Sequence, residues 1–345
     1  MIGENLILYA PNVHTGGGYA LLRALLAALP ANRPMHSFLD ARVVAQRLLP
    51  VGADVTWVRP RVLDRLLTER QLRQRCAVGD TVLCFHGLPP LFKLRGHVVV
   101  FAQNRLLFDS SSLQGYPTLT RIRLMGERLW TSTMSRNCDK YIVQSKSMAA
   151  LVQNRLGNRV ATSIFPFTPE VTDTLLTATR SCFHKYDFLY VASGEAHKNH
   201  ENLLLAWRLL AEAGLNPSLA LTVDPLSHPK LSQEIERQRN QFGLNIVSLG
   251  KVGSADIPAL YKSSSAMIFP SKVESYGLPL IEATRIGLPV LASELDYVRD
   301  VIAPAETFDP ESPVSIARAV RRFLRNPDPV TPAGTAEEFL AEVLR

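Results

Sequence analysis

Two glutamates frame a short apolar stretch in the second half of the chain. Glu274 and Glu282 stand eight positions apart, on either side of SYGLPLI. The preceding run AMIFPS (266–271) is typical of a buried strand, and LPLIEATRIG (278–287) predicts a helix with a proline in its first turn and a glycine at its end. The loop between them therefore lies at a helix N-terminus, where free backbone N–H groups and the helix dipole favour an anion such as a diphosphate.

The two carboxylates lie beside this predicted anion site, so their role must be compatible with a bound anion. Carboxylates next to a phosphate are electrostatically costly, so we expect them to accept hydrogen bonds from sugar hydroxyls. Gly277 would let the backbone approach such a ligand closely. The spacing alone is also compatible with Glu274 as a helix cap and Glu282 as a solvated helical residue.

Alternating strands and helices are expected to position these residues. The apolar run at 5–11 leads through NVHTGGGY into a helical segment, and the runs at 81–85, 97–103 and 140–145 are typical of buried parallel strands. The same alternation restarts at 187–193. The chain therefore predicts an α/β fold of two doubly wound domains, with sites at the carboxyl ends of the strands.

The domain limits follow from this alternation. With 345 residues, the chain is long enough for two hydrophobic cores. We expect one domain at 1–170, a linker at 171–186, a second domain at 187–330 and a C-terminal helix at 331–345.

The net charge of +7 belongs to the first half of the chain. Residues 1–150 contain 19 basic and 9 acidic residues, against 19 and 22 for residues 151–345. Much of the excess lies at 59–76, where leucines recur at helical spacing among six arginines. Such a helix could lie on an anionic membrane surface or hold an anionic lipid or polysaccharide, and it is also compatible with the solvated face of a packed helix. No zinc-finger spacing or arginine–aromatic pattern points to nucleic acid.

The cysteines and the apolar runs bear on the compartment. The four cysteines are far apart and lack metal-binding spacing, which predicts reduced, buried thiols; they are Cys76, Cys84, Cys138 and Cys182. No run approaches the ~20 apolar residues of a membrane span, and the first residues lack the features of a secretory signal. We expect a cytoplasmic protein, peripheral at the inner face of the plasma membrane if the basic helix binds lipid.

The stretch FPSKVESYGLPLIEATRIGLPVLAS (269–293) resembles the signature of retaining nucleotide-sugar glycosyltransferases of family 4, which have the GT-B fold of two Rossmann-like domains facing across a cleft. The resemblance implies that Glu274 faces the donor sugar and that Glu282 binds the ribose. Backbone amides of the turn between them would hold the diphosphate, and here the turn consists of Ser275, Tyr276, Gly277 and Leu278.

A second segment, VASGEAHKNHENLLLAWRLL (191–210), resembles the part of the family in which a lysine reaches the donor diphosphate. That residue is Lys198, which would stabilise the leaving group as a point charge. Many relatives carry an arginine shortly before this lysine, where this chain has Ser193. Lys251 and Lys272 are the candidates for a second cation.

The first half resembles the family more loosely. Gly16, Gly17 and Gly18 are similar to its N-terminal glycine loop, which approaches the donor phosphates, although an ordinary tight turn fits them too. CFHGLPPLF (84–92) and VVVFAQNRLLF (98–108) look like segments of bacterial surface-polysaccharide glycosyltransferases.

The loop after the strand at 97–103 departs from the family. Relatives often place a histidine there, whereas this chain has Gln103, Asn104 and Arg105. We expect Asn104 to hold a sugar hydroxyl or the acceptor, although a neutral amide cannot act as a base. His14 and His86 are nearby candidates that also fit structural roles. The family's front-face mechanism requires no protein base, because the leaving phosphate oxygen takes the acceptor's proton.

The resemblance implies transfer of a hexose, with mannose from GDP-mannose as the leading guess, to a polysaccharide or lipid-linked acceptor in O-antigen, lipopolysaccharide or capsule biosynthesis. Neither a metal nor another cofactor is expected, since the chain has no Asp-x-Asp motif. A sugar-nucleotide epimerase and a catalytically idle sugar-nucleotide-binding scaffold remain alternatives. A dinucleotide oxidoreductase fits less well, because GGGY is not GxGxxG.

Overall fold

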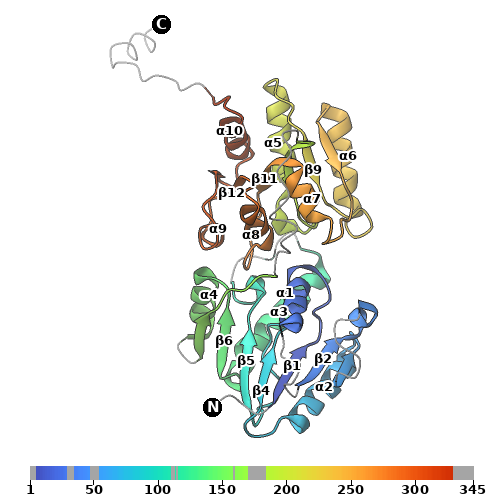
Figure 1. The fold of residues 1–345 in the computed structure, drawn as a ribbon, viewed down its shortest axis with the longest axis vertical. Helices are drawn as coiled ribbons and strands as arrows, with labels where there is room; N and C mark the ends of the chain where they lie inside the picture. The colour runs from blue at the N-terminus through green and yellow to red at the C-terminus, as the bar shows by residue number, and fades with distance from the viewer. Residues whose placement is uncertain are drawn as a thin grey trace, which may run out of the picture.

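Two parallel β-sheets, each with its own helices, dominate the structure (Figure 1). The computed structural model describes these parts of the chain: residues 5–28, 35–46, 54–109, 113, 116–157, 160–169 and 184–328. Figure 1 shows the first domain in blue to green and the second in yellow to red, stacked along the long axis of the molecule. The expectation of a two-domain doubly wound α/β fold is confirmed.

The first sheet has seven strands in the order β3-β2-β1-β4-β5-β6-β7, all parallel. The strands are β1 (Leu6–Ala10), β2 (Met35–Asp40), β3 (Asp54–Val58), β4 (Thr81–Cys84), β5 (His97–Phe101), β6 (Lys140–Val143) and β7 (Ala161–Ile164). The helices are α1 (Gly16–Ala27), η1 (Ala41–Gln46), α2 (Val62–Arg75), η2 (Arg105–Leu107), α3 (Thr118–Met134), η3 (Ser135–Asn137) and α4 (Lys146–Leu156), where η marks a 3₁₀ helix.

The second sheet has six parallel strands in the order β10-β9-β8-β11-β12-β13. The strands are β8 (Tyr186–Tyr190), β9 (Leu219–Leu221), β10 (Ile246–Ser248), β11 (Ser264–Phe269), β12 (Val290–Ser293) and β13 (Glu306–Phe308). The helices are η6 (Ala196–Lys198), α5 (His200–Glu212), α6 (Pro229–Phe242), α7 (Ile257–Lys262), α8 (Leu278–Arg285), α9 (Asp296–Arg299) and α10 (Pro313–Phe323).

Central strands are buried on both faces, which is why they are continuous apolar runs rather than alternating ones. In β11, Ala266, Met267 and Ile268 have no exposed surface, and neither do Leu8 and Tyr9 in β1. Proteins with such sheets bind their ligands at the carboxyl ends of the strands. Both β11 and β8 lead directly into the loops of the predicted site.

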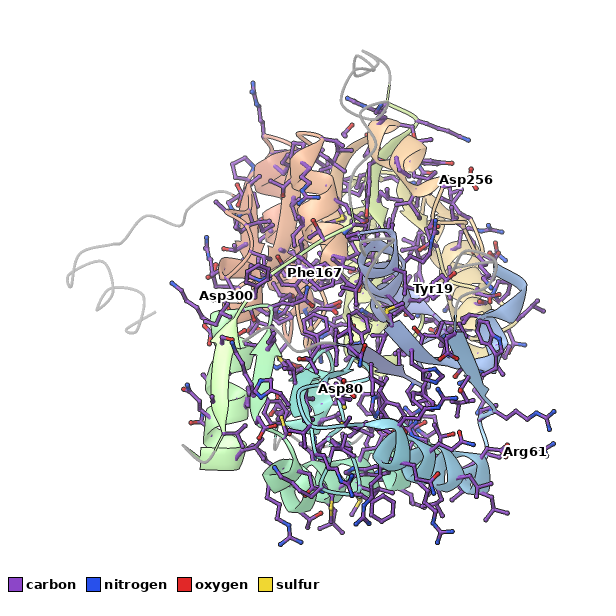
Figure 2. The ribbon with its side chains drawn as sticks, turned by 60° about the horizontal axis from the view of Figure 1, so that its bottom comes forward. Tyr19, Arg61, Asp80, Phe167, Asp256 and Asp300 are labelled. Atoms are coloured by element: carbon purple, nitrogen blue, oxygen red, sulfur yellow. The ribbon has the colours of Figure 1, made fainter. Side chains whose placement is uncertain are left out.

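The two domains contact each other through loops and helix ends near the carboxyl ends of their strands. The backbone N–H of Ser147, in α4, donates to Asp300 Oδ2 over 2.7 Å. Figure 2 labels Asp300 and Phe167 where the two domains meet. Leu278, the first residue of α8, packs on the first-domain cluster that contains Phe85. The glycines expected to form a loop instead form the first turn of α1, which begins at Gly16.

The predicted domain limits, cysteines and membrane spans can be compared with the described residues only in part. Most of the linker (171–186) and the tail helix (331–345) lie outside the described residues, so the domain limits stay a prediction. Cys76, Cys84 and Cys138 are buried free thiols, as expected, and Cys182 lies outside the described residues. Among the helices that are described, none has the length and apolar character needed to cross a bilayer.

Candidate functional site

The turn that precedes α8 forms the centre of the candidate site. Gly277 caps the helix in the left-handed region, with φ of 76°. A side chain there would be strained, and its Cβ would also lie 2.9 Å from Leu280 Cδ1. The first hydrogen bond of the helix runs from the N–H of Leu280 to the carbonyl of Gly277, so the amides from Ser275 to Leu278 precede the helical ladder. An anion is well placed to accept hydrogen bonds from them.

Glu274 and Lys198 form an ion pair beside this turn. Lys198 Nζ lies 2.6 Å from Glu274 Oε1, and the two side chains are only 17% and 13% exposed. The sequence separation is 76 residues, so the loops after β8 and β11 bring together the two residues that the family resemblance singled out. A partly buried cation at this position can stabilise a negative leaving group.

Buried hydrogen bonds fix the loop that carries Lys198. Asn199 adopts a left-handed conformation, with φ of 61°, and donates its side-chain amide to the carbonyls of Pro270 and Pro310 over 3.0 and 2.7 Å. The hydroxyl of Tyr190 donates to the carbonyl of Lys198 over 2.8 Å. These contacts tie the Lys198 loop to the strand end that leads to Glu274.

Glu282 occupies a different environment, farther along α8. Tyr261, in α7, donates its hydroxyl to Glu282 Oε2 over 2.9 Å. Burial raises the pKa of Glu282, although the hydrogen bond from Tyr261 and the charge of Arg285 oppose that shift. Glu282 therefore has a fixed partner and is not the freely solvated helical residue that the spacing alone allowed.

The first domain approaches the same turn. A Cβ on Gly17 would lie 3.2 Å from Leu278 Cδ1, and one on Gly18 would lie 3.1 Å from Gln103 Oε1. Gly17 is thus close to the start of α8 and Gly18 to the loop after β5, and a side chain at either position would require its neighbour to shift. Asn104 is nearby but occupied: its side-chain oxygen accepts from the N–H of Leu106 over 3.1 Å and caps η2.

Two contacts between the domains were not anticipated from the sequence. Tyr116 Oη lies 2.9 Å from His197 Nδ1, and the N–H of Arg105 donates to Ser275 Oγ over 2.9 Å. Burial raises the pKa of Tyr116 to about 12 and, with Lys198 nearby, lowers the pKa of His197. Both shifts favour a neutral imidazole next to a protonated phenol, joined by one hydrogen bond. Tyr116 stands in no recognisable motif, whereas His197 adjoins Lys198 in the quoted segment.

The remaining candidates lie elsewhere or are engaged. His14 is close to Asp40, at 4.0 Å, and His86 Nδ1 faces the carbonyl of Tyr9 at 3.3 Å. Burial, reinforced by Arg65, lowers the pKa of His86 well below its usual value.

The two lysines considered as a second cation for the donor phosphates, Lys272 and Lys251, lie on the surface near acidic residues. Lys272 Nζ forms an exposed ion pair with Glu311 at 2.7 Å. Lys251 is exposed, and its charge acts on Asp224. In the described part of the chain, no group of three or more His, Cys, Asp or Glu side chains has the arrangement of metal ligands.

Part of the chain matches a known protein family. Residues 183–337 match the family model of glycosyl transferases group 1. The chain is 27% identical over 219 residues to the serotype-specific mannosyltransferase WbdA of Escherichia coli, which covers 57% of this chain and 26% of WbdA. It is 32% identical over 119 residues to the O-antigen chain mannosyltransferase B of Escherichia coli, covering 34% of this chain and 31% of that protein. The chain thus spans less than a third of the length of these relatives.

Similarity of the whole fold extends over both domains. The structure of Anabaena Alr3699/HepE in complex with UDP is 15% identical to this chain, with a TM-score of 0.68, and covers 93% of this chain and 90% of that one. Such a likeness shows the two-domain architecture of GT-B glycosyltransferases. Residues 183–337 thus match the glycosyl transferases group 1 family in sequence, and the described residues of the chain have the two-domain GT-B fold.

Proposed function

We propose that the protein is a retaining glycosyltransferase that moves a hexose from a nucleoside diphosphate sugar to a polysaccharide or lipid-linked acceptor in bacterial surface-glycan synthesis. The observation that carries this proposal is the Lys198–Glu274 ion pair at the N-terminus of α8, 2.6 Å long and largely buried. It joins a cation suited to a diphosphate with a carboxylate suited to sugar hydroxyls.

The donor is proposed to lie along the turn and the first part of α8. Glu282, steadied by Tyr261, accepts hydrogen bonds from the ribose hydroxyls. Amides from Ser275 to Leu278 bind the diphosphate, and Glu274 faces the sugar. Lys198 exchanges part of its contact with Glu274 for a phosphate oxygen when the donor binds.

In the proposed reaction the bond between the anomeric carbon and the diphosphate oxygen breaks, and the diphosphate leaves with the electron pair. The acceptor hydroxyl oxygen then bonds to the same face of the anomeric carbon, and its proton passes to a diphosphate oxygen. Lys198 and the turn amides stabilise the charge that develops on the leaving group. We propose that these groups suffice without a metal ion, so transfer should persist in EDTA.

The sugar and the acceptor are inferred from relatives. WbdA and the O-antigen chain mannosyltransferase B are named as mannosyltransferases, and the second as acting on the O-antigen chain. Mannose is accordingly the leading sugar, and a growing surface polysaccharide or its lipid-linked precursor is the leading acceptor. The nucleotide base is proposed to be guanine from the family resemblance of the sequence, since the names of the relatives state no base.

We further propose that the enzyme works in the cytoplasm, at the inner face of the plasma membrane, and that α2 and α3 provide the contact. Eight of the fifteen exposed large hydrophobic side chains in the described structure belong to these two helices; they are Val62, Leu63, Leu66, Leu67, Leu119, Ile122, Met125 and Leu129. The helices adjoin each other, because Arg65 of α2 lies over the ring of Trp130 of α3, 5.8 Å from its centroid.

Charge on these helices favours an anionic lipid surface. Together α2 and α3 carry seven arginines and three acidic residues, of which Glu69 is buried and bonded to Tyr9. Figure 2 labels Arg61, just before α2, at the periphery of the first domain, pointing away from the second. Apolar side chains flanked by arginines are typical of helices that lie in the headgroup region of a membrane.

A screen of nucleoside diphosphate sugars tests the proposed reaction. Thermal unfolding of the full chain would be followed with GDP-mannose, UDP-glucose, ADP-glucose and CDP-glucose, because a ligand at a hundred times its Kd stabilises the folded state by about 2.7 kcal/mol. We expect GDP-mannose to stabilise most, and transfer to an oligomannoside acceptor to give a product of retained anomeric configuration. Binding without transfer would indicate the idle scaffold, an altered sugar without acceptor would indicate the epimerase, and no binding would contradict the proposal.

A further inference from the structure

The site lacks a second cation at the position where many members of the resembled family have an arginine. That position is Ser193, whose hydroxyl donates to the carboxylate of Glu195. Of the lysines that could compensate, Lys272 is paired with Glu311 on the surface. Lys251 is exposed near Asp224. A diphosphate held by Lys198 alone would leave most of its charge to the turn amides.

A cation from the first domain reaches the same turn. Arg105 is the first residue of η2, and its backbone N–H donates to Ser275 Oγ over 2.9 Å although 170 residues separate the two. Ser275 directly follows Glu274 and belongs to the turn whose amides precede α8. The backbone of Arg105 is therefore fixed at the candidate diphosphate site.

The guanidinium group of Arg105 is held in place and stays close to the second domain. Its Nε donates to Asp109 Oδ2 over 3.2 Å, and the side chain is 21% exposed. Its positive charge also acts on Tyr297. The ring of Tyr297 lies 3.9 Å from where a Cβ on Gly277 would be, and its hydroxyl donates to the carbonyl of Ser271. The charge of Arg105 is therefore within electrostatic reach of Tyr297, which lies beside Gly277.

We propose that Arg105 binds the donor diphosphate from the first domain and supplies the second cation that position 193 lacks. This inference rests on the proposed function, since it concerns the same donor. A guanidinium can pair with two phosphate oxygens at once, which suits it to this role better than an exposed lysine. Asp109 orients the guanidinium, and the doubly charged diphosphate competes with it for the N–H groups.

The position of the two cations on opposite domains has a consequence for closure. Lys198 belongs to the second domain and Arg105 to the first, so a diphosphate between them bridges both. The bound donor then helps to hold the domains together. This link weakens when the nucleotide leaves the site.

Calorimetric titration of the full chain with GDP and GMP, with UDP and ADP in parallel, tests this role. We expect Arg105→Gln to weaken GDP binding about 10- to 100-fold, the range for a lost charge-assisted hydrogen bond, and to weaken GMP binding less. Arg105→Lys should fall between the wild type and the Gln variant. Arg208→Gln, which removes the same charge from an exposed i,i+4 ion pair with Glu212 in α5, is the matched control and should change the Kd less than about twofold.

The outcomes separate this inference from the proposed function. If Arg105→Gln binds GDP as Arg208→Gln does while Lys198→Gln alone weakens binding, the role of Arg105 is wrong and the proposed function stands. A raised KM for the acceptor with unchanged GDP affinity would also overturn it, because Arg105 would then serve the acceptor. If the wild type binds none of the nucleotides, the proposed function itself fails. A circular dichroism melt checks that each variant is folded. If Arg105→Gln does not fold, the Arg105→Lys variant still tests the role of Arg105.

Discussion

Tyr116 Oη and His197 Nδ1 lie 2.9 Å apart although they belong to opposite domains. His197 immediately precedes Lys198, and its carbonyl accepts the N–H of Lys272 over 2.8 Å, which links the loops after β8 and β11. The phenol of the first domain therefore touches the loop that carries the candidate cation. The same hydrogen bond therefore joins the two domains and contacts the residue next to Lys198.

Replacement of Tyr116 by Phe should slow transfer without preventing donor binding. The variant loses only the hydroxyl, and a hydrogen bond of this kind is worth about 0.5–1.5 kcal/mol, so we expect kcat to fall about 2- to 10-fold. The Kd for the nucleoside diphosphate should stay within about twofold. Steady-state kinetics with calorimetry would measure both, and an unchanged kcat would show that the contact has no part in turnover.

The pair of Lys198 and Glu274 should behave as a unit. Lys198→Met is expected to lower kcat about 10²- to 10³-fold, as for other preorganised groups that stabilise developing charge. Glu274→Gln should also lower kcat, and the double variant should lose less than the product of the two single losses, because the residues contact each other. Rates for all three variants form the double-mutant cycle. Normal turnover of Lys198→Met would remove this lysine from the mechanism.

Donor binding should depend on pH through Glu282. Burial raises the pKa of this carboxyl, so it takes up a proton at a higher pH than an exposed glutamate does. A protonated carboxyl accepts ribose hydroxyls less well, and the Kd for the nucleotide should therefore rise as the pH falls toward and through this raised pKa. Calorimetry between pH 5 and 8, with Glu282→Gln as the control, measures the effect. A Gln variant with the same pH profile as the wild type would contradict it.

The sequence predicted the second-domain site better than the first-domain side of it. Glu274 and Gly277 follow a buried apolar run and precede a helix with a proline in its first turn, which is enough to place them at a helix N-terminus. Lys198 was identified only by the resemblance of its segment to the family. Strand β2 was missed because it buries polar residues: Ser37 and Asp40 are at most 1% exposed, and the carboxylate of Asp40 is paired with Arg42. A polar strand of this kind has no apolar run to indicate it.

Contacts across the domains could not be predicted in the same way. Tyr116 and Arg105 meet residues 81 and 170 positions away, and their approach depends on how two separately folded sheets pack together. The contact between Glu282 and Tyr261 could not be predicted either. Tyr261 lies on another helix, and the strand order β8-β11-β12 brings α7 and α8 near each other. Local periodicity carries no information about such packing.

Binding to anionic vesicles should depend on both the arginines in and just before α2 and the apolar side chains of α2 and α3. The structure favours Arg59, Arg61 and Arg70 as targets, since they are exposed, whereas Arg73 lies over Phe92 and Arg75 is paired with Asp54. With about 1 kcal/mol for each charge near the surface, their replacement by Gln should reduce binding about a hundredfold at low salt.

Sedimentation with phosphatidylglycerol vesicles measures this binding. The control variant replaces three arginines of the second domain by Gln, namely Arg208, Arg237 and Arg239, and should bind as the wild type does. Replacement of Leu119 and Ile122 by Ser should weaken binding even at high salt, because these side chains are 82% and 62% exposed. Wild-type protein that stays in the supernatant would make this surface an ordinary solvated face.

His200 should make stability fall in mild acid. Its ring is buried against Tyr190, with centroids 5.0 Å apart, and neither ring nitrogen has a hydrogen-bond partner. Burial, with the charge of Lys198, lowers its pKa to about 3. Below a pH of about 6.5 the unfolded chain binds a proton at this site and the folded chain does not, so unfolding becomes easier as the pH falls.

The expected slope is at most about 1.4 kcal/mol per pH unit between pH 6.5 and the folded-state pKa of about 3, and the contribution is fully present above pH 6.5. His200→Leu keeps an apolar contact with Tyr190 and removes the titration, so its denaturation midpoint should change less between pH 7 and pH 5 than that of the wild type. Urea titrations at several pH values measure the difference in slope, which a constant loss of packing does not affect. Equal slopes would mean that the His200 site takes up a proton in the folded protein as readily as in the unfolded chain.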